Sequence, residues 1–232
     1  MSRTFRPAVF LALAVGIAHV AVFANGSSVP AGPSSSSSSS LPSMTPEERA
    51  IEAYKSADSH RVKGKKLEEE ATTKKGGDAD KALAKARSEF EKSLKDFKDA
   101  AKLNPKLFQA YNGMGYAYRK TGDYTKALEM YDQAITMAPG FFPEAVEYRA
   151  EAYLALNRID DARAAYLDLF AADRKQADIL MAAMKKWVAA RQADPAGVAP
   201  EAVTGFEKWI GERDGLAKQT RLMAVSSYYT GW

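Results

Sequence analysis

The chain has 232 residues, a formal net charge of +4 and no cysteine. The absence of cysteine excludes a disulfide scaffold, a thiol nucleophile, an iron–sulfur cluster and a cysteine-based zinc site. Its 2 histidines nearly exclude a histidine-rich metal site, and its modest charge is weak support for nucleic-acid binding, which needs a concentrated basic face.

Residues 1–24 are typical of a secretory signal peptide. Arg3 and Arg6 form a positive n-region, and an uncharged stretch follows, with the small residues Val22 and Ala24 before a cleavage point. An uncleaved membrane anchor is the alternative. The apolar stretch is only just long enough to span a bilayer, which weakens this alternative. We expect an exported protein, periplasmic or secreted, with no stable membrane span after cleavage. Loss of the two arginines lowers the net charge from +4 to +2.

Residues 25–44 are rich in serine and proline, with an unbroken run from Ser34 to Ser40. Such a segment buries too little apolar surface to offset its chain entropy, so we predict a disordered linker.

From residue 45 onward the sequence has helix signals and no alternating strand pattern. Thr45 and Glu48 have the spacing of a capping box, with Pro46 at the first helical position. Residues 45–105 predict an extended helical hairpin, with a turn near Gly76 and a tip rich in lysine and glutamate. A disordered insertion is the alternative for the charged tip. Three aspartates each precede a helical run, as expected of N-cap residues: Asp123, Asp160 and Asp173.

A set of core-type residues recurs 35 positions further along the chain. Tyr111, Gly115, Tyr118, Tyr124, Ala127, Tyr131 and Ala134 align with Val146, Ala150, Tyr153, Ile159, Ala162, Tyr166 and Leu169. A period of this length indicates a stacked repeat array. Gly115 and Ala127 are small enough to let two helices approach closely.

Residues 106–139 resemble a tetratricopeptide repeat (TPR). The signature positions are occupied by Tyr111, Met114, Gly115, Tyr118, Ala127, Tyr131, Ala134 and Pro139. Residues 140–174 resemble a second, divergent repeat, and a shift of 34 residues relates the second helix of the 45–105 hairpin to the same pattern. The resemblance implies an all-α fold, a right-handed superhelical solenoid of helical hairpins with C-terminal capping helices.

Residues 175–232 predict a degenerate hairpin followed by a capping helix, because a repeat array exposes an apolar face at each end. A helix break is plausible near Asp214 and Gly215. We expect Trp187, Trp209 and Trp232 to lie in the core or the cap.

No enzyme signature stands out. His60 lies in a charged helical stretch, where we expect a solvated side chain, and no Ser–His–Asp set, P-loop or H-E-x-x-H motif is present. We therefore expect no catalytic residues, no cofactor and no metal site.

The resemblance implies that a peptide or protein partner binds the concave face formed by the first helix of each repeat. Stepping along the repeats gives these partner-binding candidates: Asn112, Tyr116, Lys120, Glu144, Glu147 and Glu151. The three glutamates share one side of a helix and would favour a basic or polar peptide, although they could serve only to solubilise the helix. The paired lysine, asparagine and arginine set with which some TPR proteins bind a C-terminal carboxylate is not evident.

We predict an exported scaffold or adaptor, most simply in a bacterial envelope, whose partner is a protein and not a nucleic acid. The alternative is an accessory subunit or a cryptic enzyme of a cell-envelope assembly.

Overall fold

The computed structural model describes residues 44–229, which form eight helices and no strand. The predicted signal peptide and residues 25–43 of the predicted linker lie outside this part of the chain. In chain order the helices are α1 (Pro46–Thr73), α2 (Gly77–Leu103), α3 (Phe108–Thr121), α4 (Tyr124–Met137), α5 (Pro143–Ala155), α6 (Ile159–Ala172), α7 (Arg174–Ala193) and α8 (Pro200–Tyr229). Within these residues, no helix combines the length and the apolarity that crossing a membrane would need.

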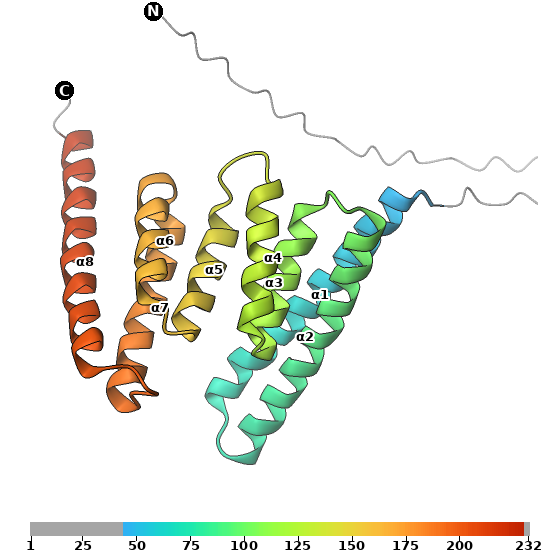
Figure 1. The fold of residues 1–232 in the computed structure, drawn as a ribbon, viewed down its shortest axis with the longest axis horizontal. Helices are drawn as coiled ribbons and strands as arrows, with labels where there is room; N and C mark the ends of the chain where they lie inside the picture. The colour runs from blue at the N-terminus through green and yellow to red at the C-terminus, as the bar shows by residue number, and fades with distance from the viewer. Residues whose placement is uncertain (1–43, 230–232) are drawn as a thin grey trace, which may run out of the picture. The chain divides into compact units, whose positions relative to one another are not determined.

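Consecutive helices pair into hairpins, and the hairpins follow one another in an array (Figure 1). Each helix packs against the next, and α1 also contacts α3, α3 contacts α5, and α5 contacts α7. The first helices of successive hairpins therefore lie side by side. This arrangement confirms the predicted all-α solenoid of helical hairpins.

Glycines on the first helix of a hairpin make room for an aromatic ring on the second. A Cβ atom added to Gly115 of α3 would lie 2.6 Å from the ring of Tyr131 on α4, and one added to Gly64 of α1 would lie 2.5 Å from Phe90 on α2. Tyr131 is fully buried as a result. The absence of a side chain at Gly115 therefore leaves the space that the ring of Tyr131 occupies. Ala127 of α4 is also fully buried.

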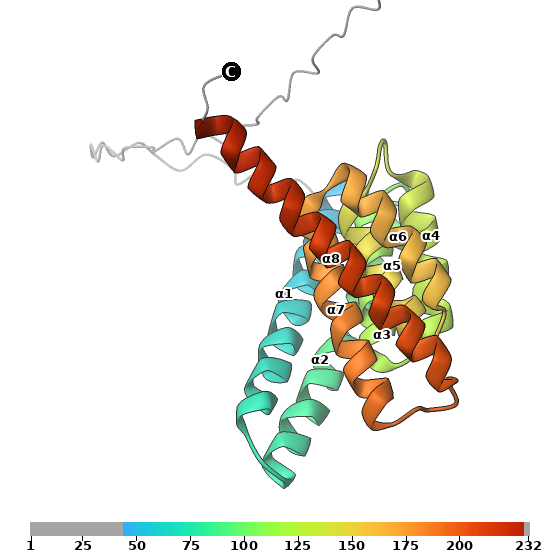
Figure 2. The ribbon, with the colours of Figure 1, turned by 90° about the vertical axis from the view of Figure 1, so that its left-hand side faces the viewer.

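The first hairpin is the longest, and its charged segment at 61–80 is helical on both sides of the turn at residues 74–76 (Figure 2). The predicted capping box begins α1: Thr45 Oγ1 accepts the Glu48 backbone N–H at 3.1 Å, and Glu48 Oε2 accepts the Thr45 N–H at 2.8 Å. Farther along, Ser93 Oγ donates to the Ala57 carbonyl at 2.8 Å in the fully buried seam between the two helices. The turn at the tip passes through Gly76, whose φ of +54° favours glycine.

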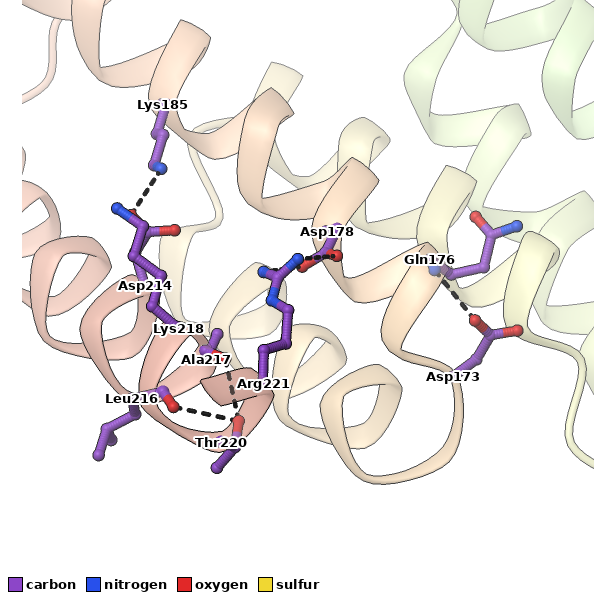
Figure 3. Close-up of polar contacts among 10 residues, drawn as sticks. All are labelled: Asp173, Gln176, Asp178, Lys185, Asp214, Leu216, Ala217, Lys218, Thr220 and Arg221. Atoms are coloured by element: carbon purple, nitrogen blue, oxygen red, sulfur yellow. Dashed lines mark hydrogen bonds and ion pairs between the residues drawn. The ribbon is translucent and has the colours of Figure 1, made fainter. Parts of the chain in front are cut away.

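Two of the three predicted N-cap aspartates act as such. Asp123 accepts the Lys126 N–H at the start of α4, and Asp173 accepts the Gln176 N–H at the start of α7 (Figure 3). The expectation for Asp160 is wrong, because α6 begins at Ile159, so Asp160 lies inside the first turn and Arg158 occupies the N-cap position.

The C-terminal part differs from the expectation in one respect. Helix α8 runs without interruption through Asp214 and Gly215, so the break expected there is absent. The carboxylate of Asp214 binds Lys218 of its own helix at 2.9 Å and Lys185 of α7 at 3.1 Å (Figure 3). These contacts hold α8 as one helix against α7, so a single helix takes the place of the second half of a hairpin plus a separate cap.

The C-terminal core contains two of the three tryptophans. Trp187 of α7 is buried with its ring centre 5.6 Å from Phe206 of α8, and Trp209 packs partly buried against Tyr166 at 5.5 Å. Trp232 lies outside the described residues.

Candidate functional site

A pocket of about 140 Å³ opens where the first helices of the first three hairpins meet. Helices α1, α3 and α5 supply most of its wall, and α2 and the residue before α5 complete it. Its lining consists of Tyr54, Arg61, Phe97, Gln109, Asn112, Gly113, Tyr116, Phe142, Glu144 and Tyr148.

The ring of Tyr116 is the centre of an aromatic and cationic cluster at this pocket. The Tyr148 ring lies edge-on at 5.1 Å between centres, and the Phe90 ring lies at 5.9 Å. The guanidinium of Arg61 lies 5.5 Å from the same ring centre, and that of Arg119 lies 5.2 Å from it. Cations over aromatic faces are attracted by the ring quadrupole, so these contacts fix the tyrosines in place.

Each cation around Tyr116 has a carboxylate partner. Arg61 pairs with Asp58 on α1 at 2.6 Å, and Lys120 reaches across to Glu68 of α1 at 2.6 Å. The mostly buried Arg119 forms an ion pair with Glu151 of α5. The positive charges of the cluster are therefore already neutralised within the fold.

Two carboxylates of α5 have no ion pair in the described part of the chain. Glu144 lines the pocket and is partly buried, and Glu147 is only 1% exposed. The Oε1 atom of Glu147 has no hydrogen-bond partner, and burial raises the pKa of this carboxyl to about 7 although the nearby Arg119 lowers it. Burial and the neighbouring carboxylate of Glu144 likewise raise the pKa of Tyr148.

Asn112, like Glu147, is a buried polar group without a partner at this site. Its side chain lines the pocket with only 7% exposure, and its Oδ1 accepts no hydrogen bond. A buried acceptor left unpaired costs about 1–3 kcal/mol, and a donor supplied by a ligand would recover that free energy.

The predicted partner-binding residues separate into three environments. Asn112, Tyr116 and Glu144 line the pocket together. Lys120 and Glu151 lie beside it and are held in ion pairs with Glu68 and Arg119. Glu147 is buried, so the expectation of an accessible strip of three glutamates is wrong at its centre.

Sequence reasoning missed several pocket residues that belong to the neighbouring helices. Tyr54 and Arg61 come from α1, Phe142 directly precedes α5, and Tyr148 lies within α5. Tyr148 could have been predicted, because residues four apart lie on the same face of a helix and Tyr148 follows the candidate Glu144 by four. The α1 residues carry no such signal, because α1 is far from the repeat consensus.

His60 is not the solvated side chain that the sequence predicts. Its Nδ1 lies 2.6 Å from Glu89 Oε2 of α2, and the imidazole is only 25% exposed. Hydrogen bonds from Lys92 and His60 lower the pKa of Glu89. Ser56 Oγ donates to Asp96 at 2.6 Å and not to His60, so serine and histidine are not arranged as a nucleophile and its base.

A second depression, of about 240 Å³, lies between α7 and α8 and is lined by Arg174, Asp178, Ala217, Thr220 and Arg221. The guanidinium of Arg221 binds both carboxylate oxygens of Asp178 at 3.0 Å (Figure 3). These two charges pair with each other across α7 and α8.

The α3–α4 hairpin provides the decisive comparison with known proteins. Residues 108–141 match the family model of the tetratricopeptide repeat. The match covers both helices of the α3–α4 hairpin, called the TPR hairpin below, and the turn after it. It begins and ends two residues later than the expected bounds of 106–139. No curated protein matches the chain. The TPR hairpin supplies Gln109, Asn112 and Tyr116 to the pocket.

Proposed function

We propose that the chain is a protein-interaction scaffold or adaptor that binds an extended segment of a protein partner at the pocket between α1, α3 and α5. The observation that carries the proposal is the position of this pocket on the TPR hairpin and its two neighbours, where Asn112 presents a buried acceptor without a partner and Glu144 a carboxylate without an ion pair in the described residues. TPR hairpins generally mediate protein–protein interaction, which supports this assignment.

The proposal includes export. Its support is the composition of residues 1–24, with Arg3 and Arg6 before an uncharged apolar stretch. Amino-terminal sequencing of the protein isolated from its native cells tests this part: a mature chain that begins at Asn25 supports export, and one that retains Arg3 and Arg6 contradicts cleavage.

Site-specific photocrosslinking tests the binding face. A benzoylphenylalanine at Gln109, which lines the pocket, is compared with one at Gln133, an exposed glutamine on α4 of the same hairpin. We expect a discrete crosslinked partner from position 109 and none from position 133. Equal crosslinking from both positions, or crosslinking from position 133 alone, would contradict the proposed face.

A further inference from the structure

The geometry points to one specific occupant of this pocket. We propose that it binds a single basic side chain, a lysine ammonium or an arginine guanidinium, presented by the partner segment. This inference rests on the proposed function and names the chemistry that the partner must carry.

The first argument is charge. Arg61, Arg119 and Lys120 are each paired with a carboxylate of this chain, so their charges cancel. Glu144, the carboxylate that lines the pocket, has no ion pair among the residues that the structure describes. The uncompensated charge at the pocket is therefore negative, and an incoming cation is the complementary ligand.

The second argument is the unpaired acceptor. The buried Oδ1 of Asn112 lacks a donor, and the carboxylate of Glu144 lines the same pocket. An ammonium carries three donors and a guanidinium carries five, and neither has an acceptor. A basic head group can donate both to Asn112 Oδ1 and to the Glu144 carboxylate, whereas a carboxylate ligand has no donor to offer either of them.

The third argument is the aromatic wall. The rings of Tyr54, Tyr116, Phe142 and Tyr148 line the pocket. The fold already places one cation, Arg61, 5.5 Å from the centre of the Tyr116 ring. A second cation between these rings would gain about 0.5–2 kcal/mol from the same ring quadrupole, depending on how fully it is desolvated.

The size of the pocket agrees with a single side chain. Its volume of about 140 Å³ is below the ~300–1,000 Å³ usual for small-molecule sites. The rest of the partner segment would lie outside the pocket, along α1, α3 and α5.

Fragment titration tests the inference on the ¹⁵N-labelled full chain. The probes are n-butylammonium and n-butylguanidinium, with 1-pentanol as a neutral analogue of similar size and butyrate as the anion. The readout is the chemical shift of the Asn112 side-chain amide. We expect saturable shifts with one or both cations, and the stronger of the two identifies the basic residue of the partner.

Glu144→Gln should weaken cation binding about tenfold, as expected when one close charge contact is lost. Glu129→Gln, on the exposed face of α4, is the matched control and should leave it unchanged. The inference is overturned if 1-pentanol shifts Asn112 as strongly as the cations do, if butyrate binds in their place, or if Glu144→Gln has no effect. The wild-type comparison of cation and alcohol decides the matter even if the variant folds poorly.

Failure here is separate from failure of the proposed function. If no cation binds but a partner still crosslinks at position 109, the proposed binding face is supported and the proposed preference for a basic side chain is contradicted. If no partner crosslinks at position 109, the proposed binding face is contradicted regardless of the result of the fragment titration.

Discussion

Replacing Glu147 by glutamine should stabilise the protein above neutral pH. The carboxyl of Glu147 is buried with an unpaired oxygen, and its pKa is raised from 4.5 to about 7. The folded state therefore holds the proton more tightly than the unfolded state does. The contribution of Glu147 to stability is greatest below pH 4.5, where both states are protonated, and it is lost as the pH rises through 7, where the folded carboxyl ionises.

The magnitude follows from the difference between the two pKa values. About 2.5 units at about 1.4 kcal/mol each give about 3 kcal/mol of lost stability at pH 8. Glu147→Gln removes the ionisation and keeps the shape, so it should recover about 3 kcal/mol at pH 8 and less than about 0.5 kcal/mol at pH 4.

Urea unfolding of both chains at pH 4, 6 and 8 measures this difference directly. Glu129→Gln, at an exposed position, should show no such trend. If Glu147→Gln is the less stable chain at pH 8, then Glu147 is ionised and gains more from Arg119 than it loses by burial, and the reasoning fails.

Three further predictions concern the packing of the hairpins. Tyr131→Ala empties a fully buried ring site and should cost about 3–5 kcal/mol in urea unfolding; an unchanged midpoint would contradict the repeat register. Gly115→Ala forces a Cβ against the Tyr131 ring and should cost about 1–3 kcal/mol, whereas Gly205→Ala on α8, where no neighbour lies within 4 Å, should not destabilise the chain. Thr45→Ala removes the capping box of α1 and should cost about 1 kcal/mol by thermal unfolding, with Thr45→Ser nearly neutral.

Local chemistry and periodicity were enough to predict the helices. The capping box at Thr45 and the N-cap aspartate at Asp123 mark helix starts through hydrogen bonds made within four residues, which a sequence displays directly. The 35-residue period revealed the stacking, because equivalent core positions must recur when identical hairpins pack. The error at Asp160 arose because a single aspartate in a first turn resembles a cap.

The site was less predictable, because its properties depend on neighbours from other hairpins. The side of α5 that carries Glu144, Glu147 and Glu151 could be read from their spacing. Their burial and ion pairing could not be predicted, because the burial of Glu147 and the ion pair of Glu151 with Arg119 depend on how closely α3 approaches α5. His60 shows the same limit: its partner Glu89 lies on the other helix of a long hairpin.

The first hairpin is longer than the others, and this extra length determines where the fold opens locally. Near its tip, α1 and α2 are joined by small buried alanines such as Ala71 and Ala82, and the last large side chains in the seam are Leu67 and Phe90. Beyond Leu67 little apolar area holds the two helices together, so this end should open at a lower free energy than the rest. Amide hydrogen exchange should therefore quicken along α1 towards Thr73, while Lys120, bound to Glu68, marks where the slow-exchanging part of the array begins.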